Sequence, residues 1–233
     1  MKKKSILCLL MAFSLLLMPG TSITANASTK ESTEIVLGDT VLETSDYDKS
    51  DISISRDLSQ KNEGIVIVTI RDKETGRILE VITEKNQSKN NLINSVNSPS
   101  GSGNYIYNIR RQRNDGPVTI YLDCTVYMSD SGMYTQINQV LGTNIYISST
   151  CDSTLENAVS YWVVPNNVFP TAEVSFWGSG VTTGKLDTSV EVGYSVEFLK
   201  SIGYSVTTTA GTTVYFRKPI SMSGTFYTYS TGH

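Results

Sequence analysis

Residues Pro117 to Met128 read PVTIYLDCTVYM and alternate without interruption between apolar and polar side chains. Because successive side chains of a strand point to opposite faces of its sheet, this stretch predicts a strand with one face in a core and one face towards water. Such half-buried strands are typical of antiparallel sheets. The apolar face would carry Val118, Ile120, Leu122, Cys124, Val126 and Met128.

Similar strand-like segments fill the chain after residue 104, and clusters of Gly, Asn, Asp, Pro and Ser separate nearly all of them. This rhythm is typical of a sandwich or a barrel. We therefore expect an all-β fold, an antiparallel β-sandwich or open barrel over residues 105–233, preceded by a small acidic β-hairpin region. The expected strands are Tyr105–Arg113, Val118–Met128, Met133–Val140, Asn144–Cys151, Tyr161–Val164, Thr171–Thr183, Val190–Phe198, Tyr204–Thr209, Thr213–Arg217 and Ser221–Tyr229.

Two segments are ambiguous between helix and strand. Residues 153–159 could form a helical turn across one end of the sheets. Ser195 to Gly203 has a capping serine, apolar residues at helical spacing and a terminal glycine. Val190 to Phe198 also alternates cleanly, and its β-branched residues favour a strand there.

The part before residue 105 differs in composition. Residues 28–61 are acidic and polar, and we expect this part to begin as a loose arm. Gly64 to Glu84 predicts a hairpin whose turn is Asp72 to Gly76. Residues 86–104 are rich in Asn, Ser and Gly, as linkers are. The expected organisation is therefore 1–27 as a signal peptide, 28–85 as an acidic region that is a propeptide or a small domain, 86–104 as a linker and 105–233 as the sandwich.

The first 27 residues have the pattern of a secretory signal peptide. Lys2, Lys3 and Lys4 precede an apolar block that is too short to span a bilayer, and small residues at Ala25 and Ala27 suit signal peptidase. We expect cleavage after Ala27 and a secreted, extracellular protein. The layout resembles that of exported proteins of Gram-positive bacteria.

Charge bears on the class of partner. After cleavage the chain would keep 16 of its 19 basic residues and all 22 acidic ones, a net charge of −6. An acidic surface repels phosphate backbones, so we expect no nucleic-acid partner. One basic cluster, Arg110, Arg111 and Arg113, predicts a charged edge strand that blocks edge-to-edge pairing, an anion site or a proteolytic processing point.

Two cysteines remain after the signal peptide, Cys124 and Cys151. An even pair in an exported chain is a disulfide candidate, and strand alternation places both on a core-facing side. Buried thiols that are not joined are the alternative.

Catalytic chemistry has few candidates. The one histidine is the last residue, His233, which removes the usual general base at neutral pH. No nucleophile, phosphate-loop or metal-ligand motif occurs, and we expect no catalytic residue, metal or other cofactor. Carboxylates are what remain for a small glycosidase, namely Asp123, Glu173, Glu191 and Glu197, and their spacing selects no pair.

Aromatic residues give the stronger functional hint. Tyr161, Trp162 and Trp177 lie late in the chain, and Trp177 should point away from Phe176, which suits the core. Exposed amphipathic rings suit sugar faces or a protein partner, whereas rings packed under loops are the structural alternative. We therefore expect a non-enzymatic module that binds a cell-surface polysaccharide or protein through these three residues. A membrane would be a partner only if alternating strands at Val190–Phe198 and Tyr204–Phe216 formed a pore.

Overall fold

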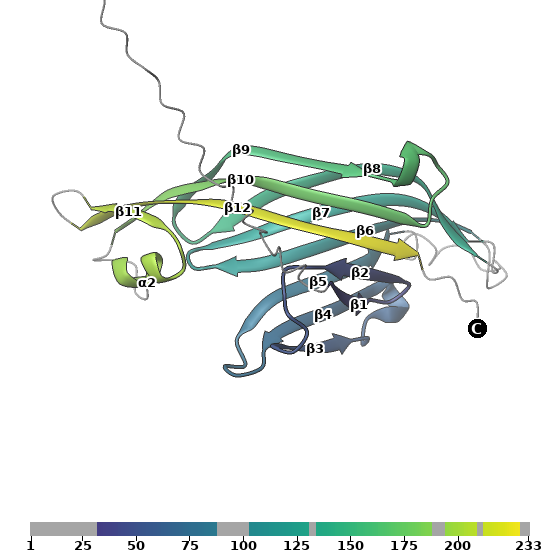
Figure 1. The fold of residues 1–233 in the computed structure, drawn as a ribbon, viewed down its shortest axis with the longest axis horizontal. Helices are drawn as coiled ribbons and strands as arrows, with labels where there is room; N and C mark the ends of the chain where they lie inside the picture. The colour runs from purple at the N-terminus through teal and green to yellow at the C-terminus, as the bar shows by residue number, and fades with distance from the viewer. Residues whose placement is uncertain (1–31, 88–102, 131–133, 188–193, 209–211, 229–233) are drawn as a thin grey trace, which may run out of the picture.

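The structure is a computed structural model that describes residues 32–87, 103–130, 134–187, 194–208 and 212–228. Within these ranges the chain is almost entirely β-structure, and it forms two antiparallel sheets that pack together (Figure 1). The all-β sandwich predicted from the alternation is therefore confirmed. The signal peptide expected over residues 1–27 lies outside the described residues, as does His233.

Sheet B contains the stretch from which the fold was predicted. Its order is β3-β4-β5-β6-β7-β8, and every neighbouring pair is antiparallel. The predicted strand is β7, whose apolar residues are buried from Val118 to Met128. The strands of sheet B are β3 (Ile52–Asp57), β4 (Ile65–Asp72), β5 (Ile78–Asn86), β6 (Gly103–Asp115), β7 (Val118–Asp130) and β8 (Thr135–Ser149).

Sheet A has the order β1-β2-β12-β10-β9, and β11 pairs with another part of β12. The expected strands Thr213–Arg217 and Ser221–Tyr229 form the single strand β12, which continues through Pro219. Pro219 lies between the part of β12 that pairs with β11 and the part that pairs with β2. A proline is tolerated where a partner strand is missing on one side. The members of sheet A are β1 (Thr33–Val36), β2 (Thr40–Thr44), β9 (Asp152–Val163), β10 (Glu173–Asp187), β11 (Ser205–Thr208) and β12 (Thr213–Thr228).

The two sheets share one core. Phe176 on β10 and Phe226 on β12 are fully buried, with ring centroids 6.1 Å apart in an edge-to-face arrangement. The sheets approach closely at Gly178, where a Cβ atom would lie 2.7 Å from the Cβ of Ile145. Any side chain at Gly178 would therefore collide with the facing sheet.

The loose arm expected at the start of residues 28–61 is wrong for the part that is described. β1 and β2 extend sheet A beside β12, and Ile35, Leu37 and Leu42 are buried in the common core. The polar composition concealed this because two threonines of β2 are also buried. One of them, Thr40, donates its hydroxyl to Glu84 of β5 at 2.5 Å.

The predicted hairpin forms from β4 and β5, and β5 also pairs with β6. Strands on both sides of the expected linker thus lie in the same sheet (Figure 1). The linker itself falls largely on residues outside the described ranges. The division of the chain into an N-terminal region and a sandwich stays a prediction.

The charged edge strand proposed for the arginine cluster is wrong, because β6 pairs with β5 on one side and with β7 on the other. The three arginines go to different places. Arg110 binds Asp123 on the outer face, Arg111 is fully buried between the sheets, and Arg113 donates to the carbonyl of Ser221.

Both ambiguous segments resolve against the sequence-based expectation. Residues 153–159 belong to strand β9 and form no helical turn. The strand favoured over Val190–Phe198 is wrong for its described part, because Val196–Ser201 forms a short helix, α2, whose first turn is capped by Ser195. The Ser195 hydroxyl accepts from the N–H of Phe198 at 3.1 Å, an interaction typical of helix starts.

The disulfide expected between Cys124 and Cys151 is absent. Register gives the reason: Cys124 lies opposite Thr143, whereas Cys151 follows Ser149, which lies opposite Val118. Val118 and Cys124 are six residues apart on β7, which is roughly 20 Å along a strand. Cys151, beyond the end of β8 near Val118, is therefore far outside disulfide range of Cys124. Alternation predicts the face of the sheet on which each thiol lies, but it does not predict the position of each thiol along the strand direction.

Candidate functional site

The outer face of sheet A carries most of the candidate binding chemistry. We call this surface the sheet A face and define it by the residues of β10, β12, β9 and β2 that point away from the core. Its inner counterpart is apolar and glycine-rich, so alternation leaves hydroxyls, aromatics and charges outside. The residues of the sheet A face include Ser175, Trp177, Ser179, Thr183, Lys185, Tyr215, Ser221, Ser223, Thr225, Tyr227, Tyr161, Glu43 and Glu173.

A hollow of about 340 Å³ lies beside Trp177, and we call it the Trp177 hollow. Trp177 is half-buried, and Tyr161 on the next strand packs against it with the two ring planes at 70°. The Ser175 and Thr225 hydroxyls lie 2.8 Å apart across β10 and β12. The hollow is lined by Ser32, Glu43, Thr44, Ser45, Ser175, Phe176, Trp177, Ser223, Gly224, Thr225 and Tyr227.

One carboxylate faces this hollow. The Tyr227 hydroxyl donates to Oε2 of Glu43 at 2.6 Å. Hydrogen bonds from the side chains of Ser32 and Tyr227 hold the pKa of Glu43 below its usual range. The hydrogen bond to Glu43 raises the pKa of the Tyr227 phenol. At neutral pH the hollow therefore presents an ionised acceptor beside a neutral phenol.

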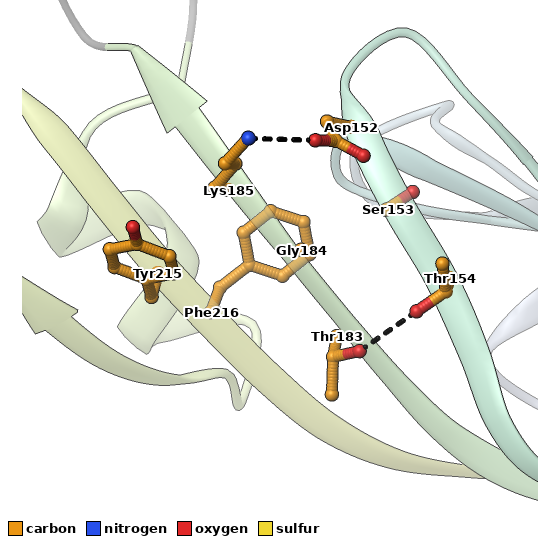
Figure 2. Close-up of a pocket in the computed structure, with 8 residues that line it drawn as sticks. All are labelled: Asp152, Ser153, Thr154, Thr183, Gly184, Lys185, Tyr215 and Phe216. Atoms are coloured by element: carbon orange, nitrogen blue, oxygen red, sulfur yellow. Dashed lines mark hydrogen bonds and ion pairs between the residues drawn. The ribbon is translucent and has the colours of Figure 1, made fainter.

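A second hollow, of about 370 Å³, lies further along the same strands, and we call it the Lys185 hollow (Figure 2). Lys185 forms an exposed ion pair with Asp152 at 2.9 Å. Thr154 and Thr183 share a hydrogen bond of 3.1 Å, and the Tyr215 ring is 48% exposed. Five of the eight lining residues point outward by strand alternation: Asp152, Thr154, Thr183, Lys185 and Tyr215.

The structure brings together two of the three predicted aromatic residues. Trp177 and Tyr161 are direct cross-strand partners on the sheet A face. Trp162 lies opposite Phe176 and so points to the other side of β9, where its ring meets Phe169 at a centroid distance of 5.9 Å. Trp162 therefore lies on the core-facing side of sheet A, on the edge strand β9, and it does not line the Trp177 hollow.

The predicted acids do not converge. Asp123 lies on the outer face of sheet B and is held by Arg110 at 2.8 Å, whereas Glu173 lies on the sheet A face beside Tyr227. Glu197 lies in the exposed first turn of α2, and Glu191 is outside the described residues. Within the described ranges, no group of three or more His, Cys, Asp or Glu side chains is placed to hold a metal ion.

Sequence reasoning missed Glu43, because it expected residues 28–61 to begin as a loose arm. The alternation of Thr40 to Thr44 was a usable signal, since it places Val41 and Glu43 on the face opposite Leu42. Two buried threonines at the ends of that segment made it look polar throughout.

Comparison with protein-family models, curated proteins and solved structures gives no significant match. Among the residues that the structure describes, no helix is both long enough and apolar enough to cross a lipid bilayer. A function for this chain must therefore be sought in the chemistry of its own surfaces.

Proposed function

We propose that the protein is a non-enzymatic binding module that holds a polysaccharide on the sheet A face. The observation that carries the proposal is the Trp177 hollow, where a half-buried indole and a tyrosine adjoin several hydroxyls and one ionised carboxylate. A sugar ring has an apolar C–H face and a rim of hydroxyls. An aromatic wall suits the first, and a few fixed polar groups suit the second.

The arrangement along the strands favours a polymer over a single sugar. Trp177 and Lys185 are eight residues apart on β10, which corresponds to about 27 Å along an extended strand. Between the two hollows the outward pairs of β10 and β12 mix hydroxyls with other side chains: Ser179 with Ser221, Val181 with Pro219, and Thr183 with Arg217. Tyr215 provides another exposed ring at the far end. A glycan chain lying along β10 would contact both hollows.

Titration with a panel of soluble polysaccharides and their oligosaccharides, followed by calorimetry, tests the proposal. We expect affinity to rise with chain length for at least one glycan. Trp177→Ala should weaken that binding by about 2 kcal/mol or more, roughly 30-fold, because a central aromatic anchor is removed.

Trp162→Phe is the matched control, because Trp162 lies on the opposite side of the sheet and the change keeps an aromatic ring beside Phe169. It should leave glycan binding unchanged. Equal binding by wild type and Trp177→Ala, or binding of none of the glycans, would contradict the proposal and would favour a protein partner.

A further inference from the structure

A larger cleft of about 840 Å³ lies away from the sheet A face, and we call it the arginine cleft. Helix α2, the turn between β6 and β7 and the start of β5 surround it. Figure 1 shows α2 and the β4–β5 hairpin on the same side of the long strands. The lining residues are Tyr47, Arg77, Ile78, Leu79, Arg113, Asn114, Asp115, Gly116, Tyr194, Phe198, Ser201, Ile202 and Lys218.

One wall of the cleft is fixed by the packing of α2 on the β6–β7 turn. Gly116 in this turn has a positive φ of 66°, and a Cβ atom there would lie 2.7 Å from Cδ1 of Ile202. Tyr194 donates its hydroxyl to the Gly116 carbonyl at 3.3 Å, and Tyr204 donates to the carbonyl of Asp115 at 3.0 Å. The helix is therefore held in place without closing the cleft.

The charges of the lining are mostly positive. Lys218 already uses two of its three N–H donors, on Asp115 at 2.6 Å and on the carbonyl of Ile202 at 2.8 Å. Arg77 and Arg113 form no ion pair with any described residue. Arg113 donates one hydrogen bond, to the Ser221 carbonyl at 3.0 Å. Two guanidinium groups that form no ion pair with a described carboxylate thus line one cleft of an acidic chain, although Arg77 interacts with Asp72 at longer range.

The same cleft has an apolar side. Ile78 is 38% exposed and Phe198 is 39% exposed, although both are large apolar side chains. The rings of Tyr194 and Phe198 lie 5.9 Å apart and form a tilted pair at the helix. Such exposure at a concave surface is typical of a binding site.

We propose that the arginine cleft binds a small molecule that joins an oxyanion, phosphate or carboxylate, to an apolar body. Guanidinium groups present planar, forked donors that match the geometry of both oxyanions. The apolar body would lie against Ile78 and Phe198. This site is separate from the proposed glycan surface, and either one can fail without the other.

Calorimetric titration of the full chain at low salt with phenyl phosphate, benzoate, inorganic phosphate and phenol tests the proposal. We expect phenyl phosphate or benzoate to bind about tenfold or more tightly than inorganic phosphate and phenol, because only the former engage both the charged and the apolar side. The ranking of phenyl phosphate against benzoate identifies the headgroup.

Arg77→Gln and Arg113→Gln should each weaken binding of the tighter probe by about tenfold or more. Phe198→Ala should reduce the preference for phenyl phosphate over inorganic phosphate. Arg56→Gln is the control for charge, because Arg56 is exposed on β3 and does not line the cleft. Three results would each overturn the proposal: no binding of either aromatic anion, no preference over inorganic phosphate, or unchanged affinity in both arginine variants.

Discussion

A chain that carries Arg111→Met should lose about 3–5 kcal/mol of its free energy of unfolding. The Arg111 side chain is fully buried and bridges both sheets. It binds Glu80 through Nε and Nη2 and Asp46 at 2.7 Å, and it donates to the carbonyl of Ser223. Methionine removes the charge and leaves the Glu80 carboxylate buried, where the Tyr47 hydroxyl, at 2.7 Å, is its one remaining side-chain donor among the described residues.

Two further variants separate the lost charge pairing from lost packing. Arg110→Met removes the neighbouring arginine, whose ion pair with Asp123 is partly exposed, and should cost no more than about 1 kcal/mol. Adding Glu80→Leu to Arg111→Met should recover much of the loss, because no unpaired charge then stays buried. Denaturant titration of all four chains measures this. Equal losses from Arg110→Met and Arg111→Met would refute the role assigned to the buried arginine.

Phe176→Ala should cost a similar amount, about 3–5 kcal/mol, for a different reason. The Phe176 ring is fully buried against Phe226, and its truncation leaves a cavity between the sheets. Trp177→Ala, one residue along the same strand, should cost much less because its ring faces outward. Denaturation midpoints compared at equal slope measure both. A loss from Trp177→Ala as large as that from Phe176→Ala would show that the indole is a core residue.

The contrast between Phe176 and Trp177 shows what alternation can predict. Period-two patterning identifies the face of a residue, and it was right for β7, for Phe176 and for Trp177. It carries no information on which strands pair or in which register they pair. The distance between Cys124 and Cys151 and the central position of β6 both depend on that pairing, so neither could be read from the pattern.

Polar residues in buried positions account for the other failures. β2 was missed because Thr40 and Thr44 are buried, and Thr40 finds its partner in Glu84, 44 positions away in sequence. Arg111 lies on the buried face of β6 with Tyr107 and Ile109, but its partners come from β5, β12 and the residues after β2. Contacts made between distant segments decide such cases. At the Trp177 hollow, the sequence predicted Trp177 and Tyr161 as binding residues. It did not predict Glu43, because strand β2 was not recognised.

The most direct test of the glycan-binding proposal is the solvent accessibility of Trp177 itself. In Trp162→Phe the only remaining tryptophan is Trp177, so acrylamide quenching of fluorescence reports on that ring alone. The half-buried ring should be quenched readily in the free protein and should become protected when a polysaccharide that binds the chain is added at saturation. Quenching that stays the same with and without bound polysaccharide would contradict the account, because the glycan would then lie elsewhere on the molecule.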